Sequence, residues 1–166
     1  MIGRTFRHSD FQLLTSDFNV GGLAGLKRRL ARECALKALF MIDMGANNTE
    51  EALHYIFDNS GGEKNTLPAR EQEFCAALVR GVVSKRDELN SMLTPFLINW
   101  KLERLAPVVR VIMHIALFET LYMKDIPFAV TINEAVELSR QYQDEESARF
   151  VNAVLDNMRL SREKRD

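Results

Sequence analysis

Apolar side chains recur every three to four positions along most of the chain after residue 26, which is the spacing of amphipathic helices. No stretch shows the alternation of polar and apolar residues, bounded by tight turns, that marks a β-hairpin. The connections after residue 68 are short, which favours helices that pack in the order of the sequence. The pattern therefore predicts an all-α fold.

The first predicted helix covers residues 27 to 44 and ends at Gly45. One apolar face holds Leu30, Cys34, Ala38, Met41 and Ile42, and a second holds Leu36, Leu39 and Phe40. The C-terminal half of this helix should therefore be buried on two sides. Only its first two turns are left to carry exposed charge.

Caps and prolines divide the rest of the chain into further helices. Asn48, followed by Glu51, resembles a capping box that opens a short helix. Pro68 suits the first turn of the next helix, whose apolar pattern continues to Leu93 before Pro95 interrupts it. Pro107 opens the most apolar segment of the chain, which we expect to be the central helix, and Pro127 separates it from another helix.

The last predicted helix begins at three acidic residues, 144 to 146, whose charge suits the positive end of a helix. Its apolar stripe contains Phe150, Val151, Val154, Leu155 and Met158. If this stripe is core, truncating Phe150 to alanine should cost about 3–5 kcal/mol.

The 166 residues, 46% hydrophobic and 27% charged, fit one ordinary globular domain. A formal net charge of -1 excludes a uniformly basic nucleic-acid binder. Residues 1–26 have no sustained period and are predicted to be a flexible N-terminal extension. We expect the helical domain to cover residues 27–160 and to be followed by a charged tail at 161–166.

Several kinds of chemistry find no support in the sequence. Cys34 and Cys75 are the only cysteines, which favours a reducing cytoplasm over a disulfide framework. No apolar run approaches the roughly 18 residues of a membrane span, and there is no signal-peptide pattern. The histidines lack metal-ligand spacing, and nucleotide-binding and nucleophile motifs are missing. We therefore expect no metal, no cofactor, no membrane association and no enzymatic activity.

Positive charge is concentrated at the start of the first predicted helix. Five positive residues stand against Glu33 there, namely Lys27, Arg28, Arg29, Arg32 and Lys37. At 100° per residue, Arg28 and Arg32 lie one turn apart, with Arg29 beside them, on the side away from the first apolar face. This spacing predicts a compact cationic patch.

A planar guanidinium can donate two parallel hydrogen bonds to a phosphate and can stack on a base, and single-stranded RNA offers both targets. The alternative is a helix start that is charged only because it is solvated. However, positive charge at this end opposes the helix dipole, so helix stability alone does not explain it.

Two stretches of the sequence resemble the bacterial transcription antitermination factor NusB family, and the resemblance covers about residues 27 to 160. The first stretch reads Arg28-Arg29-x-Ala31-Arg32-x-x-Ala35-x-x-Ala38-Leu39-Phe40-x-x-Asp43. The second reads Ile126-Pro127-x-x-Val130-x-Ile132-Asn133-Glu134-Ala135-Val136-Glu137-Leu138, followed by Ser147-x-x-Phe150-Val151-Asn152-x-Val154-Leu155-Asp156. The sequence departs from the family pattern at Val109, where an acidic residue is common, and at His114, where arginine is frequent. These two departures are expected to remove an internal ion pair.

The resemblance implies a compact single-domain bundle of about seven helices in two helical subdomains. It also implies binding to the boxA element of nascent ribosomal RNA transcripts together with NusE, a small-subunit ribosomal protein. The two proteins would join the antitermination complex around RNA polymerase and support transcription of rRNA operons.

The resemblance also assigns roles to individual residues. RNA contact would fall to Lys27, Arg28, Arg29 and Arg32, and Asp125 would lie near the RNA-facing surface. The other signature residues would have structural roles as helix caps, cross-links or core, and these are Asn133, Glu134, Phe150 and Asn152.

Two other functions remain open. The chain could be a helical protein-interaction module or a homodimer without RNA binding of its own. It could also correspond to the helical accessory domain of an rRNA cytosine methyltransferase, in which case we expect no catalysis to reside in these residues.

Overall fold

The computed structural model describes residues 24–45, 48–59 and 67–164, and this part of the chain is helical without a strand. The prediction of an all-α fold is therefore confirmed. Seven α-helices and two short 3-10 helices follow one another: α2 (Ala24–Asp43), α3 (Thr49–Asn59), α4 (Ala69–Ser84), α5 (Arg86–Leu93), η1 (Thr94–Phe96), η2 (Leu102–Arg104), α6 (Pro107–Tyr122), α7 (Phe128–Tyr142) and α8 (Glu145–Glu163).

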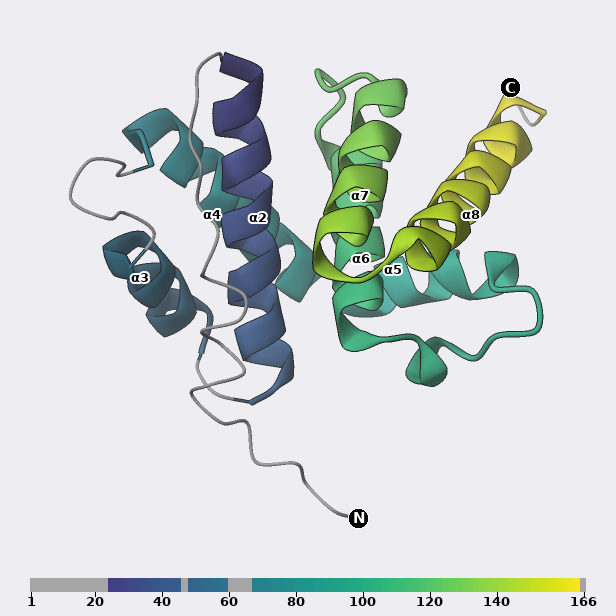
Figure 1. Cartoon of the computed structure of the whole chain (residues 1–166), viewed down its shortest axis with the longest axis horizontal. Helices are drawn as coiled ribbons and strands as arrows, with labels where there is room; N and C mark the ends of the chain where they lie inside the picture. The colour runs from purple at the N-terminus through teal and green to yellow at the C-terminus, as the bar shows by residue number, and fades with distance from the viewer. Residues whose placement is uncertain (1–23, 46–47, 60–66, 165–166) are drawn as a thin grey trace.

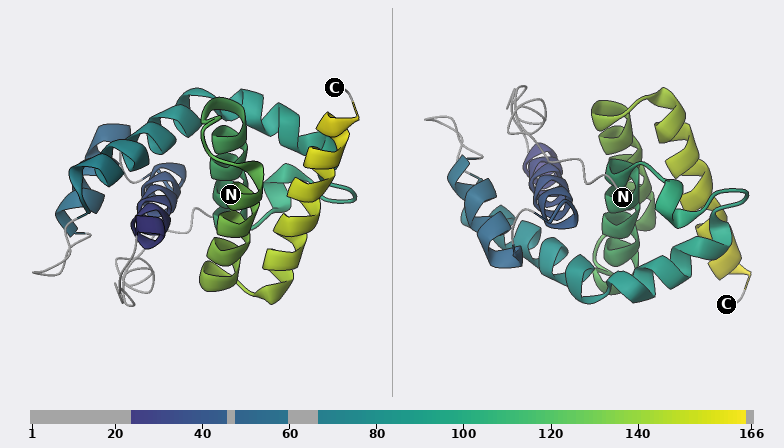
Figure 2. Two further views of the ribbon diagram at one scale, coloured as in Figure 1. Left: turned by 90° about the horizontal axis from the view of Figure 1, so that it is seen from above. Right: turned by 90° about the horizontal axis from the view of Figure 1, so that it is seen from below.

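The helices form two groups (Figure 1). In the first group α2 packs against α3 and α4, and in the second α7 packs against α6 and α8. The two groups meet where α2 and α4 contact α6. Views from above and below show α6 and α7 side by side between α2 and α8 (Figure 2). Helix α6 thus lies at the centre of the molecule, as its apolar sequence predicts.

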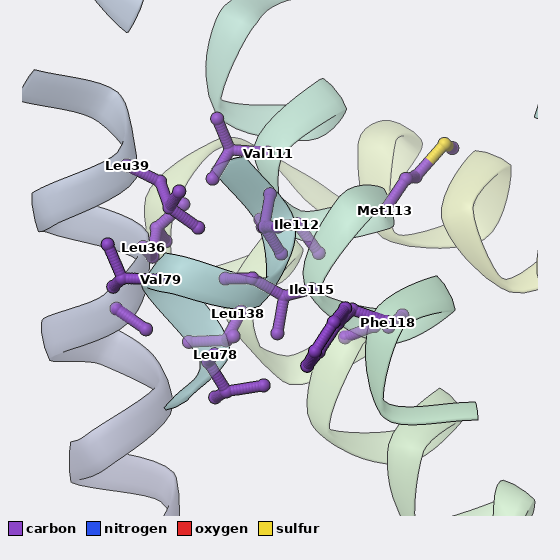
Figure 3. Close-up of a cluster of buried hydrophobic side chains, with 14 of the residues drawn as sticks. Leu36, Leu39, Leu78, Val79, Val111, Ile112, Met113, Ile115, Phe118 and Leu138 are labelled. Carbon is purple, nitrogen blue, oxygen red and sulfur yellow. The ribbon is translucent and has the colours of Figure 1, made fainter. Parts of the chain in front are cut away.

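The hydrophobic core is built around α6 (Figure 3). Every residue from Val108 to Glu119 except Arg110 is buried. Helices α4 and α6 approach closely, because a Cβ atom added at Gly81 would lie 1.9 Å from the ring of Phe118. Only glycine fits at this crossing.

The helix ends follow the predicted capping signals. Asn48 Oδ1 accepts a hydrogen bond from the backbone N–H of Glu51 at 3.0 Å, and the Glu51 side chain accepts one in return from the N–H of Asn48. Gly45, just after α2, has the left-handed φ of 72° that glycine adopts without strain. Asp144 caps α8 by accepting a hydrogen bond from the N–H of Ser147 at 2.7 Å.

The boundaries of some elements differ from the prediction. Helix α2 begins at Ala24, inside the predicted extension, and α8 runs on to Glu163, inside the predicted tail. The rest of the predicted extension, residues 1–23, lies outside the described residues, as do residues 165–166. Helix α4 stops at Ser84 and α5 starts two residues later, so the periodic pattern there covers two helices rather than one.

His114 is buried in α6, and its Nε2 lies 2.8 Å from Oδ1 of Asn90. Its Nδ1 is buried and has no hydrogen-bond partner among the described residues. Burial, together with the nearby charges of Arg86 and Arg110, lowers the pKa of His114 to about 4, although the charge of Asp43 opposes the shift. The imidazole is therefore neutral at pH 7, and it occupies this core position without an ionic partner.

The described residues contain no helix that is both long and apolar enough to cross a lipid bilayer. Within the same residues, no three histidine, cysteine or acidic side chains come together in a group that could hold a metal ion.

Candidate functional site

The first two turns of α2 point their basic side chains into three different environments. Lys27 is exposed, Arg28 and Arg29 are half-buried, and Arg32 is only 4% exposed. The prediction of one exposed cationic patch is therefore wrong for Arg32. The reason is that α6 and α7 cover the side of α2 that lies away from its first apolar face.

Arg32 is held in a buried ion pair with Glu119 of α6. Its Nε donates to Glu119 Oε1 at 2.6 Å, and its Nη2 donates to Oε2 at 3.1 Å. The hydroxyl of Thr131, at the start of α7, donates to the same Oε2 at 2.9 Å. Both carboxylate oxygens are thus satisfied, which a buried charge requires.

Arg29 pairs in the same two-pronged way with Glu134 of α7. The nitrogen–oxygen distances are 3.0 Å and 2.8 Å, and the Arg29 side chain keeps 35% of its surface exposed. The hydrogen bond to Glu134 raises the pKa of Arg29. Glu134 therefore links α7 to α2, and the Arg32 guanidinium lies 3.8 Å from it. We call Arg29, Arg32, Glu119, Thr131 and Glu134 the inner network.

Outside the inner network, a groove of about 980 Å³ opens between α2, α4, the end of α6 and the start of α7. Besides the buried Arg32 of the inner network, three cationic side chains line it, namely Arg28 of α2, Arg70 of α4 and Lys124 of the α6–α7 connection. None of the three lies within 4.0 Å of a carboxylate of the described residues. We call these three residues the groove rim.

The groove also has an apolar floor and two acidic residues, Asp125 and the Glu134 of the inner network. Leu121, Met123, Ile126 and Val130 contribute apolar surface, and Asp125 lines the groove with an exposed side chain. Asp125 and Arg28, which are far apart in sequence, thus border the same groove. A groove with unpaired cations beside apolar surface can take up a phosphate and a base at once.

Arg70 and Lys124 were not singled out from the sequence. Each stands as an isolated basic residue, 54 positions from the other, so no local charge cluster indicates them. Only the packing of α4 beside α2 and of the α6–α7 connection beside both brings them together with Arg28.

Asn133, Asn152 and Phe150 are expected to have structural roles in the last two helices, but they differ in their exposure and contacts. Asn133 and Asn152 are exposed within α7 and α8, and neither makes a hydrogen bond to another helix of the described chain. The expectation that they cap or cross-link helices is therefore wrong, because their side chains face solvent. Phe150 is half-buried rather than core, and its ring packs against that of Trp100 at 6.1 Å between centroids.

A smaller pocket of about 430 Å³ lies beside this aromatic pair and shares no lining residue with the inner network. Trp100, Arg104 and Phe150 line it together with the acidic residues Asp144 and Glu146. We call it the Trp100 pocket. Its acidic side chains make it unsuitable for a phosphate, in contrast to the groove rim.

Comparison with known proteins decides the family. The model of the NusB family matches residues 29–159. The chain belongs to the NusB family. Transcription antitermination protein NusB of Bacillus subtilis (strain 168) is 42% identical over 134 residues, which are 81% of this chain and 95% of that protein. The NusB protein of Myxococcus xanthus (strain DK1622) is 38% identical, with 81% of this chain and 95% of that protein covered.

Solved NusB structures have the same fold. T. maritima NusB superposes with a TM-score of 0.70 at 32% identity, covering 79% of this chain and 89% of that one. A crystal structure of the antitermination factors NusB and NusE in complex with dsRNA gives a TM-score of 0.70 at 25% identity, covering 80% of this chain and 96% of that one. A compact bundle of seven helices in two groups is thus the NusB fold, and its family places the chain among non-enzymatic transcription antitermination factors.

Proposed function

We propose that this NusB chain is an RNA-binding adaptor that recognises boxA-type single-stranded RNA in nascent rRNA transcripts together with NusE. In this function it acts in the bacterial cytoplasm, joins the antitermination complex around RNA polymerase and supports transcription of rRNA operons. The observation that carries the proposal is the groove rim, because Arg28, Arg70 and Lys124 have no carboxylate partners among the described residues.

The groove provides the two kinds of contact that RNA recognition needs. The cations of the groove rim would pair with phosphates and supply affinity, while the apolar floor and Asp125 would face a base. Lys27, exposed one residue before Arg28, extends the positive surface along α2. The structural relative that contains NusB, NusE and dsRNA supports a partnership with both RNA and a second protein.

Arg29 and Arg32 differ in their access to RNA. Arg29 keeps part of its surface exposed beside the groove, so it can add a long-range attraction to phosphate while it stays bound to Glu134. Arg32 is buried, and all of its assigned contacts are inside the protein. We therefore assign RNA contact to the groove rim, Lys27 and Arg29, and not to Arg32.

The test is a fluorescence-anisotropy titration of a labelled boxA-type RNA and a scrambled RNA of the same composition, each with and without NusE. We expect tighter binding to the boxA-type RNA and a further gain when NusE is present. Arg28→Ala should weaken binding, whereas Arg104→Ala, which removes an equal charge from the Trp100 pocket, should not. Equal affinity for both RNAs would contradict specific recognition.

A second candidate function is that of a protein-interaction module or homodimer without RNA binding of its own. Trp100 is 54% exposed and the neighbouring Ile98 is 71% exposed, and large exposed apolar side chains are typical of binding surfaces. Light scattering with and without RNA separates the two candidates. A dimer that persists in high salt and never binds RNA would favour this second function.

A further inference from the structure

Phe74 of α4 lies directly under the Arg28 guanidinium. The Cζ atom of Arg28 is 4.2 Å from the centroid of the Phe74 ring, and both residues line the groove. The Cζ atom of Arg32 is 5.4 Å from the same centroid. One buried ring therefore contacts two guanidinium groups of α2, one in the inner network and one on the groove rim.

An arginine side chain can be held by a carboxylate or by an aromatic ring, and the two partners leave different parts of the guanidinium free for a ligand. A carboxylate binds the N–H groups at the edge of the guanidinium, as Glu119 does for Arg32, and thereby uses the donors that a phosphate would need. An aromatic ring contacts the flat face of the guanidinium and leaves the N–H edge open. The ring of Phe74, 4.2 Å from the Arg28 Cζ atom, thus contacts the guanidinium while no carboxylate of the described residues lies within 4.0 Å of it.

Phe74 is itself well fixed. Phe74 is 8% exposed, and Arg32, which contacts it, is held by Glu119, whose Oε2 also accepts a hydrogen bond from Thr131. A restrained arginine loses less conformational freedom when it binds a phosphate than a freely moving one does.

We propose that Phe74 is a positioning residue for RNA binding, whose ring holds the Arg28 guanidinium in the groove with its N–H edge free for a phosphate. This inference rests on the proposed function, because it explains how one residue of the groove rim is prepared for its ligand. Phe74 acts through Arg28, so its effect on RNA affinity must disappear when Arg28 is absent.

The binding test uses the full chain, the boxA-type RNA and four variants. Phe74→Leu keeps an apolar side chain but removes the ring, and we expect RNA affinity to fall about two- to fivefold. Phe74→Tyr keeps the ring and should bind as the wild type does. In an Arg28→Ala background, Phe74→Leu should cause no additional loss. Phe150→Leu is the matched control, because it removes a half-buried ring beside the Trp100 pocket, and it should leave affinity unchanged.

A second measurement works without RNA, which keeps the inference testable if Phe74→Leu lowers stability. In the free protein, the ring current of Phe74 should shift the NMR resonance of the Arg28 Nε–H group. Phe74→Leu should abolish that shift, and Phe150→Leu should preserve it.

The outcomes separate the two proposals. The inference is overturned if wild-type protein binds RNA but Phe74→Leu binds equally well, or if the losses from Phe74→Leu and Arg28→Ala multiply. It is also overturned if the Arg28 resonance is the same in wild type and Phe74→Leu. Failure of the wild type to bind boxA-type RNA, with the expected Arg28 resonance present, would instead count against the proposed function.

Discussion

Arg32 and Arg28 lie one turn apart on α2, and their surroundings are opposite. In the inner network, Arg32 is buried and its guanidinium is bound through its edge by Glu119. On the groove rim, the guanidinium carbon of Arg28 lies 4.2 Å from the centroid of the Phe74 ring, and Arg28 has no carboxylate partner among the described residues. The same residue type in one short motif thus supports the fold at one position and offers hydrogen-bond donors at the other.

The comparison also explains why positive charge gathers at the start of a helix, where the dipole disfavours it. Glu119 and Glu134 come from α6 and α7 and neutralise two of the arginines. Between residues 27 and 32 of α2, the remaining cations are Lys27 and Arg28, and neither has a carboxylate within 4.0 Å among the described residues.

The largest expected effect comes from breaking the inner network. Arg32→Leu leaves the Glu119 carboxylate buried without its cation, which should lower the free energy of unfolding by about 3–5 kcal/mol. Urea denaturation measures this loss. The double variant Arg32→Leu/Glu119→Leu should recover much of it, because a buried ion pair can be replaced by apolar side chains. A loss below about 1 kcal/mol in the single variant would mean that the ion pair does not support the fold.

The stability of the protein at acid pH tests His114, which is buried in α6 together with Glu119. The pKa of His114 is about 4 in the folded protein, against an ordinary 6.5, so the unfolded chain binds more protons between these two values. Stability from this group is therefore complete above pH 6.5 and is lost as the pH falls toward 4, by about 3 kcal/mol in total.

The measurement is urea denaturation at several pH values for the wild type and for His114→Gln. The variant should be less stable at pH 7 but should lose less stability between pH 6.5 and 4 than the wild type does. Parallel pH curves for the two proteins would contradict the assignment to His114.

Replacing Arg29 should have an intermediate effect on the free energy of unfolding, since its ion pair with Glu134 is only partly buried. Arg29→Ala should reduce the free energy of unfolding by about 1 kcal/mol, because the pair is two-pronged but partly screened by water. Thermal unfolding monitored by circular dichroism gives the value. A loss of stability as large as that of Arg32→Leu would mean that the ion pair of Arg29 supports the fold as strongly as that of Arg32.

The groove rim should have the smallest effect on stability. Arg28→Ala, Arg70→Ala and Lys124→Ala should each change the free energy of unfolding by less than about 0.5 kcal/mol, as is usual for surface side chains. The same unfolding assays apply. A clear destabilisation by Arg70→Ala or Lys124→Ala would show that these side chains have structural partners and are not available to RNA.

Local patterns were enough to predict most of the helices, because capping residues, prolines and the apolar period act over a few positions. The capping box at Asn48 and the central place of α6 were predicted in this way. The break between α4 and α5 was missed, since both helices continue one apolar pattern across Lys85.

The site was predicted less completely than the fold. The motif around Arg28 pointed to the helix that borders the groove, but Glu119 is 87 positions from Arg32, and nothing in the local sequence shows that the two will pair. Arg70 and Lys124 join Arg28 only through the packing of separate helices. Burial and pairing of charges depend on tertiary contacts, and these decide which arginines stay available.

The salt dependence of RNA binding tests the central claim most directly. Three phosphate contacts from the groove rim should contribute roughly -2 to the slope when the logarithm of the binding constant for boxA-type RNA is plotted against the logarithm of salt concentration. The triple variant Arg28→Ala/Arg70→Ala/Lys124→Ala should flatten the slope by about this amount and leave only the contribution of Lys27 and Arg29, while Arg104→Ala should leave the slope unchanged. A triple variant that keeps the wild-type affinity and slope would contradict the assignment of RNA binding to the groove.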